Sequence, residues 1–122
     1  MNEGTRIFPG LVSPFRRFLT VCEGGNCRSV ALARVLKISF GQPAISLGWR
    51  YASLEMWRML GAWAEYIVLM EESFLSKVPD EFSSKYRVLD VGPDIYGIPT
   101  HAVLYGMCFE AAIDWSKRDF LL

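Results

Sequence analysis

Apolar residues along this chain form short runs that alternate with longer segments in which they recur every three or four positions. The short runs predict strands at 18–21, 44–47, 66–70 and 86–90. The longer segments predict helices at 29–38, 54–64 and 100–115, with a shorter helix at 72–77. Strands that alternate with helices pair in parallel through right-handed crossovers, so we expect an α/β domain.

The segment between the first predicted strand and the first predicted helix carries candidate chemistry. It reads Cys22-Glu23-Gly24-Gly25-Asn26-Cys27-Arg28-Ser29. Its glycines permit tight turns in which backbone amides face one oxyanion, and the helix N-terminus points to the same place. Arg28 is placed to bind two phosphoryl oxygens at once. Residues 23–27 and Ser29 are therefore the expected phosphate-binding residues.

Cys22 is the candidate nucleophile of this loop. The backbone amides, the helix N-terminus and Arg28 all favour its thiolate, and Ser29 is placed to donate a hydrogen bond to its sulfur. The alternative is that Cys22 and Cys27 are small buried hydrophobic residues at a strand-to-helix turn. That alternative leaves Arg28 and the glycines unexplained.

This loop resembles the signature of the low-molecular-weight protein tyrosine phosphatases, Cys-x-Gly-Asn-x-Cys-Arg-Ser. The positions that match in register are Cys22, Gly24, Cys27, Arg28 and Ser29. Gly25 stands where the family has asparagine, and Asn26 follows one place later. Glycine can adopt the left-handed conformation of that asparagine but lacks its side-chain hydrogen bonds, so we expect a softer loop.

Two later segments extend the resemblance. Residues 63–73 resemble the family's third strand and the acidic turn after it, and Asp94-Ile95-Tyr96-Gly97 resembles its Asp-Pro-Tyr loop. Asp94 is thereby implied as the general acid, and Tyr96 as a residue at the entrance; the alternative for this triplet is a surface turn after Gly92-Pro93. The expected fold is a three-layer α/β/α domain whose four-stranded parallel sheet has the order 2-1-3-4.

The resemblance implies a cysteine-dependent phosphatase acting on phosphotyrosine or other aryl phosphomonoesters. Cys22 attacks phosphorus, Arg28 and the loop amides bind the equatorial oxygens, and Asp94 protonates the leaving phenolate. Water assisted by Asp94 then hydrolyses the cysteinyl phosphate, with no metal or organic cofactor. The family's matching cysteine also suggests that Cys27 traps oxidised Cys22 as a reversible disulfide.

Composition narrows the classes of partner. Thirteen basic and thirteen acidic residues give zero net charge, so no global field attracts nucleic acid or an anionic membrane. With 122 residues, 52% of them hydrophobic, we expect one domain, preceded by an irregular extension at 1–17. The chain shows no membrane span or signal-peptide core, and its three cysteines favour reduced thiols. We therefore expect a cytoplasmic protein, and the sequence does not define its oligomeric state.

Three further residues invite a functional interpretation. Trp49 follows the second strand at the same sheet edge as the loop, where it either walls a slot for a phenyl ring or packs under a loop. His101 is the only histidine, so neither a Ser-His-Asp triad nor a histidine-rich metal site can be built. Cys108 lies on an apolar helix face and is expected in the core.

Two other functions stay open at this stage. The first is a binding protein that holds a phosphorylated ligand without turnover, which is suggested by Gly25, by Ile95 in place of proline and by the short chain. The second is arsenate reduction, which needs a relay of additional cysteines. Only Cys108 lies beyond the loop, so arsenate reduction ranks last.

Overall fold

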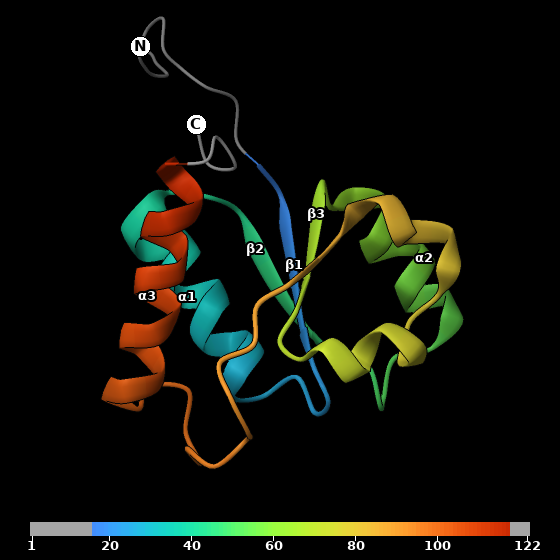
Figure 1. The fold of residues 1–122 in the computed structure, drawn as a ribbon. Helices are drawn as coiled ribbons and strands as arrows, with labels where there is room; N and C mark the ends of the chain where they lie inside the picture. Colours follow the sequence, from blue (N-terminus) through green and yellow to red (C-terminus); the bar gives the residue numbers. More distant parts are fainter. Residues whose placement is uncertain (1–15, 118–122) are drawn as a thin grey trace, which may run out of the picture.

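The computed structural model describes residues 16–117, which form a four-stranded parallel sheet (Figure 1). Its strands are β1 (Phe18–Cys22), β2 (Ala44–Gly48), β3 (Tyr66–Leu69) and β4 (Tyr86–Val88). Their order is β2-β1-β3-β4, which confirms the predicted fold class and topology. Most of the predicted N-terminal extension lies outside the described residues; only Arg16 and Arg17 are described, and they precede β1 without regular structure.

Helices cover both faces of this sheet. They are α1 (Arg28–Phe40), α2 (Leu54–Trp63) and α3 (Ala102–Lys117), with two 3-10 helices, η1 (Glu72–Lys77) and η2 (Asp80–Lys85). Figure 1 shows α1 and α3 together on one side of the sheet and α2 on the other, as a three-layer fold requires. Neither the 3-10 geometry at 72–77 nor the second such helix was predicted. In the described part of the chain, no helix is both long and apolar enough to cross a membrane.

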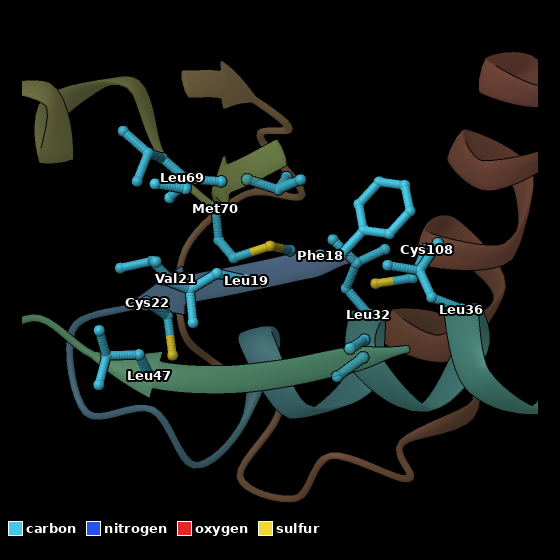
Figure 2. Packing of buried hydrophobic residues seen from close by; sticks show 14 of the residues in the cluster. Phe18, Leu19, Val21, Cys22, Leu32, Leu36, Leu47, Leu69, Met70 and Cys108 are labelled. Atoms are coloured by element: carbon cyan, nitrogen blue, oxygen red, sulfur yellow. The ribbon is translucent and has the colours of Figure 1, made fainter. Parts of the chain in front are cut away.

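β1 is the centre of the core, because it pairs with β2 on one side and β3 on the other. All five of its residues are buried. Figure 2 shows its side chains among leucines from α1 and the neighbouring strands. The one polar residue of the strand, Thr20, donates a hydrogen bond to the carbonyl of Ser29 (2.7 Å), which ties the start of α1 to β1.

The opposite layer depends on a close contact at Gly61. A Cβ atom added at Gly61 in α2 would lie 2.6 Å from Cε2 of Phe82, a buried residue of η2. The ammonium group of Lys85 holds the same place together, because it donates to the carbonyls of Gly61 (2.7 Å) and Ala64 (2.8 Å). Lys85 thereby supplies hydrogen bonds to carbonyls at the end of α2.

This contact predicts that Gly61→Ala destabilises the fold although alanine is the better helix former. Helix propensity favours alanine by about 0.5–1 kcal/mol, whereas overpacking a filled site typically costs about 1–3 kcal/mol. Gly106→Ala in α3 is the matched control, since a Cβ there meets nothing within 4 Å. Urea unfolding should show a lower midpoint for Gly61→Ala and a higher one for Gly106→Ala. Equal changes would contradict the packing argument.

Candidate active site

The loop between β1 and α1 gathers hydrogen-bond donors at the sulfur of Cys22. Cys22 ends β1 and is only 2% exposed. Its Sγ atom accepts a hydrogen bond from the backbone amide of Gly25 (3.2 Å) and shares another with the hydroxyl of Ser29 (3.1 Å). Such donors stabilise a negative sulfur, so the structure brings Cys22 and Ser29 together as a nucleophile site requires.

The loop is held against the end of β2 by backbone contacts. The amides of Trp49 and Arg50 donate to the carbonyls of Cys22 (3.0 Å) and Glu23 (3.1 Å), which extends the β1–β2 pairing into the loop. Gly25 has a φ of 72°, and a Cβ atom there would overlap the amide nitrogen of Gly48. The asparagine of the family signature therefore has no room here, and the loop is closely packed at the position where we expected it to be soft.

Arg28 is a buried cation, and its hydrogen-bond partners both lie at the Nη1 atom of its guanidinium. Its Nη1 atom donates to Oε1 of Glu71 (3.0 Å) and to the carbonyl of Gly92 (3.0 Å), and its guanidinium lies 5.6 Å from the centroid of the Phe74 ring. Hydrogen bonds from Arg28 and Ser73 hold the pKa of the Glu71 carboxyl below its ordinary value. The Nε atom of Arg28 is buried and has no hydrogen-bond partner among the described residues.

A cavity of about 400 Å³ opens beside Arg28. It is lined by Glu23, Arg28, Glu71, Asp90, Gly92, Pro93 and Asp94. Three residues from the predicted site thus meet here, whereas Cys22 does not itself line the cavity. Glu71 and Asp90 were not among the predicted site residues. The sequence did hold a signal for Glu71, because this residue follows β3 at the sheet edge where parallel sheets bind ligands.

Asp94 lies near Cys27, a residue of the loop at 22–28. Cys27 is buried, and burial first, then the carboxylate of Asp94, raises the pKa of its thiol above the ordinary value. The turn that carries Asp94 is closed by the amide of Gly92, which donates to Oδ1 of Asp90 (2.8 Å).

The remaining candidates lie outside the cavity lining. Trp49 is half-buried and packs against Phe74 with ring centroids 5.7 Å apart, which favours the packing interpretation of this residue. Tyr96 is half-buried and contacts His101 edge to face at 5.0 Å. Gly24 is part of the loop, and the neighbouring side chain of Asn26 is exposed.

The three cysteines are free thiols. Figure 2 shows Cys22 beside Leu47 and Cys108 at the other end of the core near Leu36. Burial raises the pKa of the Cys108 thiol to about 12, with a smaller effect of Cys27 in the same direction. The Cys22–Cys27 disulfide remains a prediction. Within residues 16–117, no three His, Cys, Asp or Glu side chains are grouped to hold a metal ion.

Comparison with known proteins identifies solved structures that share this architecture. No family model and no curated protein matches the chain. Vibrio vulnificus Wzb in complex with benzylphosphonate matches at 20% identity and a TM-score of 0.67, covering 86% of this chain and 99% of Wzb. The tyrosine phosphatase Wzb from Escherichia coli K30 in complex with phosphate matches at 21% and 0.65, covering 87% and 99%.

The Erwinia amylovora tyrosine phosphatase AmsI matches at 18% identity and a TM-score of 0.67, covering 91% of this chain and 96% of AmsI. At such identities the likeness concerns the fold. It runs over nearly the whole length of each phosphatase, and the element order is the one that the loop motif implies. The chain therefore has the fold of the low-molecular-weight protein tyrosine phosphatases, the family that its loop at 22–29 resembles.

Proposed function

We propose that this protein is a cysteine-dependent phosphatase that hydrolyses phosphotyrosine or other aryl phosphomonoesters. One observation carries the proposal: donors gather at the sulfur of Cys22, and the first residue of α1 along the same loop, Arg28, lines the adjoining cavity with a Nε atom that has no hydrogen-bond partner among the described residues. A thiolate and an anion-binding cation on one short loop are what in-line attack on a phosphoryl group requires. The phosphatase fold of the structural neighbours supports the same chemistry.

The reaction would run in two steps. Cys22 Sγ attacks phosphorus and forms the S–P bond as the bond to the leaving phenolate oxygen breaks, while Arg28 and the loop amides hold the equatorial oxygens. Asp94 gives its proton to the phenolate. Asp94, now a carboxylate, then removes a proton from water, which attacks phosphorus and releases inorganic phosphate and the Cys22 thiolate.

A binding protein is the second candidate, and one observation favours it. Cys22 is 2% exposed and is absent from the cavity lining, while Arg28 is already bonded to Glu71. Such a protein would hold a phosphorylated ligand on Arg28 without presenting it to the sulfur. Turnover separates the two candidates, because both predict phosphate binding.

The first test is hydrolysis of p-nitrophenyl phosphate. We expect turnover by the wild type and none by Cys22→Ser, because a serine hydroxyl is a far weaker nucleophile than a thiolate near neutral pH. Cys108→Ala is the matched control and should retain activity, since Cys108 lies in the core away from Cys22. Phosphate binding without any wild-type turnover would favour the binding protein.

The second test concerns Asp94 as the general acid. General acid catalysis is typically worth about a hundred- to ten-thousand-fold, and a poor leaving group needs it most. Asp94→Asn should therefore slow hydrolysis of phenyl phosphate far more than that of p-nitrophenyl phosphate. Asp90→Asn is the control, because Asp90 lines the same cavity while its carboxylate accepts the Gly92 amide. A larger selective loss from Asp90→Asn would reassign the acid.

The third test concerns the packing of the loop. Gly25→Ala should abolish turnover and phosphate-induced thermal stabilisation, because its Cβ would overlap the β2 backbone and displace the amide that faces Cys22. Gly24→Ala is the matched control, since its Cβ meets only the Asn26 side chain, at 3.3 Å. Full activity in Gly25→Ala would show that the loop amides are not the anion site.

A further inference from the structure

A second cavity of about 560 Å³ lies against the first. Its apolar lining comes from the segment after β4 and from α3, namely Leu89, Val91, Val103 and Met107. Its carboxylates are Asp90 and Glu110. Gly106 opens the α3 side, since a Cβ there would meet nothing within 4 Å. The result is a groove with an apolar floor and acidic edges.

The groove is continuous with the candidate active site. Asp90 lines both cavities, and the residues that follow it, from Gly92 to Asp94, line only the first. A molecule whose phosphoryl group lies on Arg28 and which extends past Asp90 would therefore enter the groove. A small aryl phosphate can use only the first cavity, whereas a phosphorylated polypeptide can reach both.

The charges along this path are mostly negative. Four carboxylates line the first cavity, and Arg28 is the only cation among its lining residues. Glu71 is paired with Arg28, and Glu23 is paired with Arg50. Among the described residues Asp90 and Glu110 are in no ion pair, and no Lys or Arg lines the groove. The unpaired carboxylates repel a dianionic phosphoryl group, and positive charge elsewhere on the same molecule offsets that repulsion.

One buried cation shows where the anion of such a molecule would lie. Arg28 is 3% exposed, lines the first cavity and has a buried Nε atom without a partner among the described residues. The path therefore offers a guanidinium for a phosphoryl group, then carboxylates in no ion pair among the described residues, then an apolar lining. Arg28 complements an anion, the carboxylates complement a cation, and the apolar lining complements an apolar side chain, all within one extended polypeptide.

We propose that the groove binds the residues flanking the phosphotyrosine of a protein substrate, with an apolar side chain on Val91 and Val103 and a Lys or Arg between Asp90 and Glu110. This inference rests on the proposed phosphatase function and names its substrate class. The groove selects phosphotyrosine in a basic and apolar context over the same residue in an acidic one.

The test compares two phosphotyrosine peptides that carry a leucine and differ only in flanking Lys or Glu residues. We expect the wild type to have the higher kcat/KM on the Lys peptide. Glu110→Gln should lower that kcat/KM about two- to fivefold at low salt, as for an exposed ion pair, and leave p-nitrophenyl phosphate hydrolysis unchanged. Glu55→Gln in α2, the same change on the opposite side of the sheet, should have no effect.

A second variant tests the floor of the groove. Gly106→Phe should fill the groove and reduce kcat/KM on both peptides, with no effect on p-nitrophenyl phosphate. Gly106→Ala controls for helix propensity, and circular dichroism confirms that both variants fold. A role of Gly106 in stability alone would affect the small substrate and the peptides equally.

Each outcome decides the inference. Equal kcat/KM values on the two peptides, or the same effect from Glu110→Gln and Glu55→Gln, would overturn it. If the wild type hydrolyses no substrate, the proposed function fails, and fluorescence anisotropy with the labelled peptides then tests the groove alone. Tighter binding of the Lys peptide, weakened by Glu110→Gln, would support the inference, and equal affinities would refute it.

Discussion

The backbone contact between the loop at 22–28 and the end of β2 is the constraint on which the candidate site depends. Gly25 and Gly48 approach so closely that neither has room for a side chain, and the amides of Trp49 and Arg50 continue the β1–β2 hydrogen bonding into the loop. Because β1 is buried on every side, the loop begins from a rigid base. The Gly25 amide thereby reaches the sulfur of Cys22, and α1 starts at Arg28 with its N-terminus at the same place. A side chain at either glycine would separate these groups.

Arg28 carries the second constraint, because a buried charge has to be compensated. Its Nη1 atom uses the carboxylate of Glu71, which follows β3, and the carbonyl of Gly92, which belongs to the segment after β4. One guanidinium therefore links three elements that are distant in sequence. It also brings the segment that carries Asp94 to the edge of the loop at 22–28, where Asp94 lies near Cys27. In the proposed function, an anion bound by Arg28 would lie within this network.

The fold by itself leaves function open, since one scaffold can carry different sites. The similarity to the Wzb and AmsI phosphatases extends over almost the whole of those chains at about one residue in five identical. Two cavities lie at and beside the candidate site. Their lining is rich in carboxylates, and Trp49 packs on Phe74 and lies outside the cavity lining. In the proposed function, these features favour contacts with the flanking residues of a polypeptide substrate over a wall for the phenyl ring.

The sequence alone determined the order and type of the main elements, the strand order through the family resemblance, and the residues of the loop. Those features are encoded locally, in apolar spacing and in one motif of adjacent residues, so a single chain suffices to recognise them. Only the tertiary structure revealed η2, the short β4, the position of Cys22 outside the cavity lining, the pairing of Arg28 with Glu71 and the place of Asp90 between two cavities. Each of these depends on which distant residues fill the space around a side chain. Close packing in three dimensions decides which residues fill that space. Residue propensity and spacing along the chain do not carry this information.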